Sequence, residues 1–466
     1  MQVNELFRQS NTILLDGGMG TMLQAAGLKL GARPEELNIT DPALIEGIHG
    51  QYAAAGSRIV NANTFGASAH KLAGSTYTLE QVITAGIENC KRACAPYGAL
   101  TALDVGPLGE LLEPSGTLAF EDAVAEYARI VKAGEAAGAD LIFFETYTDL
   151  YELKAALLAA KENTRLPILA SMSFEAGGRT FTGCTVESFA ATARGLGADA
   201  VGINCSLGPK EIFPMAKRLA EAVPGNFPVF VKPNAGLPDP QTNEYTITAA
   251  EFAREMVPFT QLGVRILGGC CGTSPAFIQE LRHAIGTQPP EVTRPPKRRG
   301  VCSASQVAEL TGVRVVGERI NPTGKKRFQQ ALREHDLDYI LNQAMAQQDA
   351  GADILDVNVG LPGIDEVAMM TDVVKAIQSV VSLPLQIDST NPEVIEAGLR
   401  ACCGRAIVNS VNGKTEILEA ILPIVKKYGA AVVGLAMDEN GLPETAQQRL
   451  DLAERILNAA LAHGIP

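Results

Sequence analysis

The first 286 residues alternate between short apolar runs and longer segments with helical periodicity, and this alternation constrains the fold most. Eight such runs occur, at Thr12–Leu15, Arg58–Ala62, Ala99–Leu103, Asp140–Phe144, Pro167–Met172, Ala200–Ile203, Pro228–Val231 and Val264–Leu267. Runs that are apolar throughout indicate parallel strands buried on both faces. Eight strand–helix units in this length predict a (β/α)8 TIM barrel over residues 1–286.

Polar residues follow each of these eight runs. They are Asp16 to Thr21, Asn61 to Thr64, Asp104, Glu145-Thr146, Ser171 to Ser173, Asn204-Cys205, Lys232 to Asn234 and Cys270-Cys271. In a barrel of this class the carboxyl ends of the strands meet on one face, and the active site is built there. We therefore expect these side chains to share one face.

A Pro-rich and basic stretch follows, and we interpret residues 287–312 as a semi-rigid linker. The strand–helix alternation then resumes over residues 313–466. Strands are expected at Val313–Arg319, Asp353–Val357, Pro384–Ile387, Ala406–Val408 and Ala431–Leu435, with a last helix over Glu444–Ala462. This predicts a second, incomplete TIM-barrel-like α/β domain with about five of eight units. We expect the chain to be C-terminally truncated; the alternative is a second domain that is not a barrel.

Composition argues against several classes of protein, namely nucleic-acid-binding, membrane-spanning and secreted proteins. The net charge of the 466 residues is −13, and Lys and Arg are scattered, so nucleic acid is not an expected partner. No apolar run approaches the ~20 residues of a membrane helix. The N-terminus lacks a secretory signal pattern, and the nine cysteines include no Cys-x-x-Cys. We expect reduced thiols and a cytoplasmic location.

Three cysteines lie at expected strand ends: Cys205 after the sixth run, and Cys270 and Cys271 after the eighth. Three thiolates with an open fourth position are typical of catalytic zinc. The alternative is three buried cysteines without metal, since cysteine is often buried. Zinc held by thiolates is suited to lowering the pKa of a substrate thiol, which predicts alkylation of a thiol.

Four motifs in residues 1–286 resemble the homocysteine S-methyltransferase family: Asp16-Gly17-Gly18-Met19-Gly20-Thr21, Glu145-Thr146, Gly202-Ile203-Asn204-Cys205 and Gly268-Gly269-Cys270-Cys271-Gly272. The resemblance implies a zinc-bearing barrel with Cys205, Cys270 and Cys271 as ligands, and Asn234 as a displaceable fourth ligand. It implies that Asp16 and Glu145 bind the ammonium of homocysteine, and that Gly17, Gly18 and Met19 bind its carboxylate. The plain alternatives are that Asp16 caps the next segment and that Glu145 pairs with a nearby lysine.

The second domain resembles the pterin-binding domain shared with dihydropteroate synthase. The motifs are Gly317 to Gly324, Asp356-Val357-Asn358, Gln386 to Thr390 and Val408-Asn409-Ser410. Amides and carboxylates at strand ends can pair with the polar edge of a pterin ring. The resemblance implies pterin contacts from Glu318, Asn321, Asp356, Asn358, Asp388 and Asn409, although each alone could be an ordinary loop or cap residue.

A homocysteine barrel followed by a methyltetrahydrofolate barrel is similar to the order in cobalamin-dependent methionine synthases. This implies methyl transfer to homocysteine from methylcobalamin, which 5-methyltetrahydrofolate recharges. No His here follows an Asp at the Asp-x-His spacing of a corrinoid ligand loop, so a separate cobalamin-binding module is implied. Two alternatives stay open: a homocysteine methyltransferase that uses S-methylmethionine or betaine directly, and a truncated chain that binds zinc and homocysteine without turnover.

Overall fold

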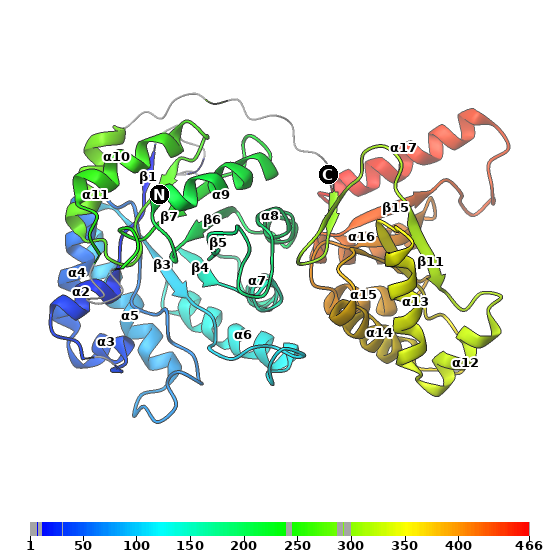
Figure 1. The fold of residues 1–466 in the computed structure, drawn as a ribbon, viewed down its shortest axis with the longest axis horizontal. Coiled ribbons are helices and arrows are strands. Elements are labelled where there is room, and N and C mark those ends of the chain that lie inside the picture. The colour runs from blue at the N-terminus through cyan, green and yellow to red at the C-terminus, as the bar shows by residue number, and fades with distance from the viewer. Residues whose placement is uncertain are drawn as a thin grey trace. The chain divides into compact units, whose positions relative to one another are not determined.

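All eight strands expected in the first part of the chain are present in the computed structural model (Figure 1), which describes residues 12–29, 31–238, 245–286 and 300–465, with Phe7 and Val292. The chain divides into two compact units, Met1–Lys297 and Arg298–Pro466. The strands of the first unit are β1 (Ile13–Leu14), β2 (Ile59–Asn61), β3 (Leu100–Val105), β4 (Leu141–Tyr147), β5 (Ile168–Met172), β6 (Ala200–Asn204), β7 (Val229–Lys232) and β8 (Ile266–Leu267).

These strands form one parallel sheet in sequential order from β2 to β8, and β1 pairs with β8. The remaining gap is bridged by Arg58, whose N–H donates to the carbonyl of Leu14 at 2.7 Å. The sheet is therefore a nearly closed barrel, which confirms the expected fold of this unit.

Helices follow the strands and surround the barrel in Figure 1. They are α2 (Met19–Ala25), α3 (Leu37–Thr40), α4 (Pro42–Ala55), α5 (Leu79–Cys94), α6 (Phe120–Ala136), α7 (Leu150–Asn163), α8 (Val186–Gly195), α9 (Pro209–Ala222), α10 (Ala249–Thr260) and α11 (Pro275–Ile285). Side-chain caps begin several of them; Thr78 and Thr248 each form a capping box with the residue three positions on. Gly56 ends α4 with φ +116°, a left-handed conformation that glycine adopts without strain.

One buried apolar cluster draws residues from every strand of the barrel, so its members face the interior. It includes Ile59 of β2, Ala102 of β3, Phe143 of β4, Ala200 of β6 and Phe230 of β7. Alternate residues of a strand share a face. The last inward positions toward the carboxyl ends are polar on these strands and on β5: Asn61, Asp104, Glu145, Ser171, Asn204 and Lys232.

The second unit contains a five-stranded parallel sheet in the order β11-β12-β13-β14-β15. Its strands are β11 (Val316–Ile320), β12 (Ile354–Val357), β13 (Leu385–Asp388), β14 (Ile407–Asn412) and β15 (Ala431–Leu435), and its helices are α12 (Lys326–Glu334), α13 (Leu337–Asp349), α14 (Glu366–Val380), α15 (Pro392–Ala401), α16 (Thr415–Tyr428) and α17 (Ala446–Ala462). In the part of the chain that the structure describes, β11 and β15 each have one neighbour, so the sheet is open. This confirms the expected incomplete second barrel.

The linker expected at residues 287–312 is wrong in its second half, because that half contains two strands. Residues 287–291 and 293–299 lie outside the described residues, but β9 (Gly300–Cys302) and β10 (Val307–Glu309) form an antiparallel hairpin. Val301 and Ala308 of this hairpin are buried against Ile354 and Ile407, the first residues of β12 and β14. The hairpin therefore covers the amino-terminal end of the second sheet and is part of that unit.

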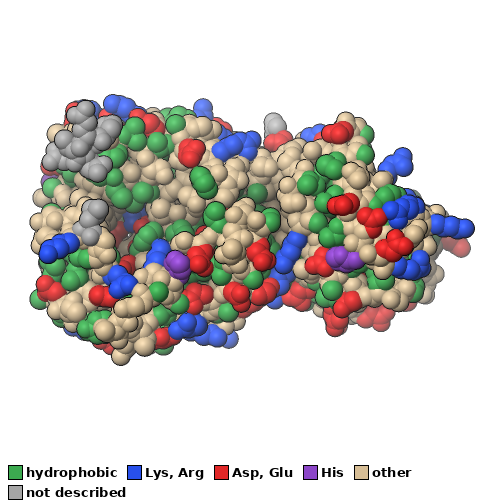
Figure 2. All heavy atoms as spheres, turned by 60° about the horizontal axis from the view of Figure 1, so that its bottom comes forward, with side chains coloured by type: hydrophobic (Ala, Val, Ile, Leu, Met, Phe, Trp, Pro, Cys, Tyr) green, Lys and Arg blue, Asp and Glu red, His purple; other side chains and the backbone are tan. Residues whose placement is uncertain are grey.

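Charges are mixed over the face drawn in Figure 2, where acidic and basic side chains are interspersed. None of the helices among the described residues combines the length and the apolar character that crossing a bilayer requires.

Candidate active site

Three sulfur atoms converge where β6 and β8 end. Cys205 directly follows β6, and Cys270 and Cys271 follow β8; the sulfurs of all three lie within 4.8 Å of one another. The Sγ atoms of Cys205 and Cys271 are 3.9 Å apart. Two sulfurs that share one tetrahedral zinc at about 2.3 Å are separated by about 3.8 Å. The donor set and its spacing therefore fit a zinc ion.

The thiols are held by the end of β7, which lies between β6 and β8. Cys205 N–H donates to the carbonyl of Lys232 at 3.0 Å, and Cys270 N–H donates to that of Pro233 at 2.8 Å. Cys271 N–H donates to Oδ1 of Asn234 at 3.1 Å. The amide oxygen of Asn234, the expected fourth ligand, is thus directed at the backbone of a cysteine ligand.

The backbone here adopts conformations that side chains seldom allow. Thr146, Cys205 and Ser206 have φ of 67°, 60° and 61°. Each such non-glycine residue costs on the order of 1–3 kcal/mol, so the surrounding contacts must impose it. Backbone strain of this kind concentrates at functional sites.

Asn204 supplies such contacts to Thr146. Its Oδ1 accepts hydrogen bonds from Thr146 N–H and from the Ser171 hydroxyl, both at 2.9 Å. Its Nδ2 donates to Thr146 Oγ1 at 2.7 Å and lies 4.0 Å from Cys270 Sγ. This fully buried amide therefore joins the ends of β4, β5 and β6 to the thiols.

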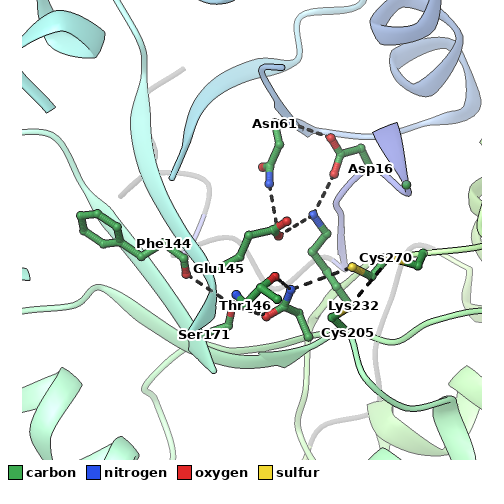
Figure 3. Close-up of polar contacts among 12 residues, drawn as sticks. Asp16, Asn61, Phe144, Glu145, Thr146, Ser171, Cys205, Lys232 and Cys270 are labelled. Carbon is green, nitrogen blue, oxygen red and sulfur yellow. Dashed lines mark hydrogen bonds and ion pairs between the residues drawn. The ribbon is translucent and has the colours of Figure 1, made fainter. Parts of the chain in front are cut away.

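A buried lysine lies between the two carboxylates expected to bind an ammonium. Lys232 Nζ is 3.1 Å from Asp16 Oδ1 and 3.0 Å from Glu145 Oε2, as Figure 3 shows. Glu145 thus pairs with a lysine, which is the alternative to ammonium binding given above. Asp16 does not cap α2, whose N-cap is Gly18 without a side-chain cap; it accepts from Asn61 N–H at 2.7 Å instead.

Burial governs ionisation in this cluster. It raises the pKa of Asp16 and of Glu145, while the positive charge of Lys232 acts to lower both. Burial, followed by the negative charge of Glu145, raises the pKa of Asp104 well above its usual range. The charges of Asp16 and Glu145 hold the pKa of Lys232 well above its ordinary value, although burial opposes them. Lys232 is therefore a permanent cation of this cluster.

The glycine turn after β1 packs against the cysteine turn. Gly18 N–H donates to the carbonyl of Thr273 at 3.3 Å and lies 3.2 Å from its Oγ1. A Cβ on Gly18 would lie 2.8 Å from the carbonyl oxygen of Cys270, so only glycine permits this approach. The structure thus brings Gly17, Gly18 and Met19 beside the thiols, with the N–H of Gly18 already engaged.

In the second unit, the expected pterin contacts gather at the ends of β12, β13 and β14. Asn358 Nδ2 donates to Asp388 Oδ2 at 2.9 Å, and Asp388 is in register with Asn409. Asp356 Oδ1 accepts from Gln386 Nε2 at 2.6 Å. Burial raises the pKa of Asp356 to about 6.

Two of the expected pterin residues face other partners. Glu318 on β11 forms an exposed ion pair with Lys325 at 3.0 Å. Asn321 Oδ1 accepts from Thr323 N–H at 2.9 Å within its own loop. Both contacts are local, but Glu318 also acts on the cluster at the strand ends, where burial raises the pKa of Asp356 and of Asp388 and the negative charge of Glu318 adds to this rise.

The sequence places Asn61, Asp104, Asn204 and Lys232 on the expected polar face, and Gln386 in a pterin motif, but assigns none of them an individual role. The available signal was the alternation along each strand. Each of the four residues of the barrel lies two positions, or a multiple of two, beyond an inward apolar residue of its own strand.

Comparison with known proteins agrees with this organisation. Residues 13–285 match the family model described as homocysteine S-methyltransferase, and residues 317–463 match that described as pterin binding enzyme. Two curated proteins named methionine synthase, from Mycobacterium tuberculosis and Mycobacterium leprae, are 33% and 32% identical over 95% of this chain. The chain spans 39% of the length of each.

Among solved structures, the oxidized form of the homocysteine methyltransferase MmuM from Escherichia coli matches with a TM-score of 0.52 and 25% identity. The match covers 60% of this chain and 97% of that one.

Proposed function

The chain belongs to the homocysteine S-methyltransferase family, and we propose that its first unit transfers a methyl group to the sulfur of homocysteine, forming methionine. The observation that carries this proposal is the convergence of Cys205, Cys270 and Cys271 beside the buried Asp16–Lys232–Glu145 cluster. A site for a soft metal and a site for a charged amino acid adjoin at the carboxyl end of one barrel. An amino acid with a thiol side chain satisfies both.

The three cysteines would hold zinc, which when bound lowers the pKa of a thiol that reaches it. Asn204 and the β7 end keep the sulfurs in place, and Asn234 orients Cys271 through its backbone N–H. Asp16 and Glu145 orient the substrate ammonium, and the turn formed by Gly17, Gly18 and Met19 receives the carboxylate. Because the N–H of Gly18 is engaged by Thr273, the turn offers the N–H groups of Gly17 and Met19. Together they direct the substrate sulfur toward the thiols.

For the methyl donor, we propose methylcobalamin carried on another module or protein and recharged by 5-methyltetrahydrofolate at the second unit. The hydrogen-bonded set Asp356, Asn358, Asp388 and Gln386 supports this, because it offers donors and acceptors along one edge for a pterin ring. The curated relatives named methionine synthase also support it.

The open edges of the second sheet favour a second candidate, a chain that binds zinc and homocysteine without turnover. Val433 and Leu435 on β15 are 39% and 45% exposed among the residues that the structure describes.

A donor comparison tests the proposal. The full chain, loaded with zinc, is given homocysteine with free methylcobalamin, with betaine or with S-methylmethionine, and methionine is measured. Methionine from methylcobalamin alone supports the proposal. Methionine from betaine or S-methylmethionine identifies a direct methyltransferase, and none from any donor despite bound zinc and homocysteine supports the binding chain.

A further inference from the structure

In the proposed site, three ligand thiolates and a substrate thiolate share one metal and compete for the same methyl group. All four are nucleophiles of one kind, because the reactive form of a thiol is its thiolate. Methylation of a ligand cysteine would damage the site, since a thioether lacks the negative charge of a thiolate ligand. Selective transfer therefore needs a feature that makes the ligand sulfurs less reactive than the entering one.

Two of the ligand sulfurs accept hydrogen bonds from groups at the end of β6. Asn204 Nδ2, on the last residue of that strand, lies 4.0 Å from Cys270 Sγ. The backbone N–H of Ser206 donates to Cys205 Sγ. Both donors belong to the barrel framework, so their positions are fixed by the strand that carries them.

The third ligand sulfur has a donor from outside the strands. Tyr245 lies in the connection between β7 and α10, and its hydroxyl forms a hydrogen bond with Cys271 Sγ. The phenol is the donor toward a thiolate, which has no proton to give. Asn234, at the start of the same connection, accepts from Cys271 N–H at 3.1 Å. This connection therefore contacts Cys271 at both its backbone and its sulfur.

Packing holds the Tyr245 ring independently of its hydroxyl. Tyr245 and Pro238 form an antiparallel bridge, so the connection folds back on itself. The ring lies against Gly272, where an added Cβ would be 2.6 Å from Tyr245 Cδ2. Gly272 has φ +79°, and its missing Cβ permits both this conformation and the close approach of the ring. A phenylalanine at position 245 would therefore keep the packing and remove only the hydrogen bond.

We propose that Tyr245 is a positioning residue whose hydroxyl withdraws charge from Cys271, so that the methyl group goes to the substrate sulfur instead. The inference rests on the proposed function and adds a residue to it. A hydrogen bond to a thiolate lowers the pKa of the thiol, and nucleophilicity falls with that pKa. The transfer is the same at either sulfur: the thiolate electron pair forms the sulfur–carbon bond, and the methyl donor keeps the pair of the bond that breaks.

Methyl iodide tests this, because it methylates accessible thiolates without a protein partner and releases iodide. The full chain and Tyr245→Phe, both saturated with zinc, are treated with it, and S-methylcysteine at each position is followed by peptide mass spectrometry. We expect Cys271 to be methylated about 3- to 10-fold faster in the variant, and Cys205 and Cys270 at unchanged rates. A charge-assisted hydrogen bond changes an ionisation constant by about 10- to 100-fold, and about half of that change, on a logarithmic scale, reaches the rate.

The same reaction with homocysteine present measures the selectivity. The ratio of methionine to methylated Cys271 should be about 3- to 10-fold lower in Tyr245→Phe than in the wild type. Tyr97→Phe is the matched control: it removes the hydroxyl of an exposed ring just before β3, at the other end of the barrel, and should change neither rate nor ratio. Tyr245→Leu, which also lacks the hydroxyl, serves the same comparison if the phenylalanine variant fails to fold.

Equal methylation of Cys271 in the wild type and the variant would overturn the inference while leaving the proposed function intact. A folded Tyr245→Phe chain that takes up no zinc would also overturn it, because the hydroxyl would then serve to hold the metal. If the wild type binds no zinc, or forms no methionine from homocysteine and methyl iodide, the proposed function fails and the inference falls with it.

Discussion

The Sγ atoms of Cys205 and Cys271 lie 3.9 Å apart although 66 residues separate them in sequence. The barrel produces this contact, because β6 and β8 both pair with β7 and end on the same face. Within the thiol cluster, hydrogen bonds from Cys205 and Cys270 lower the pKa of Cys271.

Replacing Cys271 with Ala should abolish zinc binding and methyl transfer together. Loss of an outer-shell partner already costs about 10- to 100-fold in metal affinity, so loss of a ligand should cost more than about 100-fold. Zinc stoichiometry and methionine formation are measured on the same preparation. Cys403→Ala, the same change in the second unit, should affect neither. A Cys271→Ala protein with one zinc and full activity would refute the ligand assignment.

Binding of a substrate thiol to the zinc-loaded chain should release its proton at neutral pH. A free thiol has a pKa of about 8.5 and is mostly protonated there, whereas a metal ligand must be a thiolate. 4-Mercaptobutanoic acid isolates this proton because it carries no ammonium. Calorimetry in buffers of different ionisation enthalpy counts the protons, and a count of zero would argue against thiol activation by the metal.

Glu152 should make the stability of the chain depend on pH. Burial raises its pKa from the ordinary 4.5 to about 7, so the folded state binds a proton that the unfolded state releases. The resulting stabilisation is present below about pH 4.5 and is lost as the pH rises to about 7.

Relative to Glu152→Gln, the wild type should therefore lose up to about 3 kcal/mol of unfolding free energy across this window. Urea unfolding at several pH values measures the difference. Parallel pH profiles for the two proteins would contradict this account.

The alternation of apolar runs was sufficient to predict all eight barrel strands, and the barrel rule was sufficient to predict that polar strand ends share a face. The roles of individual site residues could not be predicted from these two patterns alone, because the roles depend on contacts between different strands. In the sequence, Lys232 is an ordinary polar residue at a strand end. Its role as the counter-ion of Asp16 and Glu145 becomes visible only from their contacts in the structure.

The β9–β10 hairpin, which lies within the expected linker, could not be predicted for a different reason. β9 and β10 are three residues each, too short for a periodic pattern, and their stability comes from packing against distant strands. The direction of the Asn234 amide is likewise set by a contact, with Cys271 N–H, that spacing does not encode.

The second unit should bind 5-methyltetrahydrofolate, and Asp388→Asn should weaken that binding by about 10-fold, because the pterin edge would lose a charged acceptor. Asp349→Asn is the control: this exposed carboxylate ends α13, just before β12, and so lies at the other edge of the sheet. Fluorescence titration of the full chain measures both. Wild-type protein that does not bind the folate would contradict the proposed role of this unit.

The central feature proposed for the first unit is a metal that is held by three cysteine sulfurs and is open to a substrate thiol. X-ray absorption at the zinc edge, recorded on the full chain with and without homocysteine, tests this most directly. We expect three sulfur neighbours at about 2.3 Å without substrate and four with it. A sulfur count that homocysteine leaves unchanged would contradict the central claim.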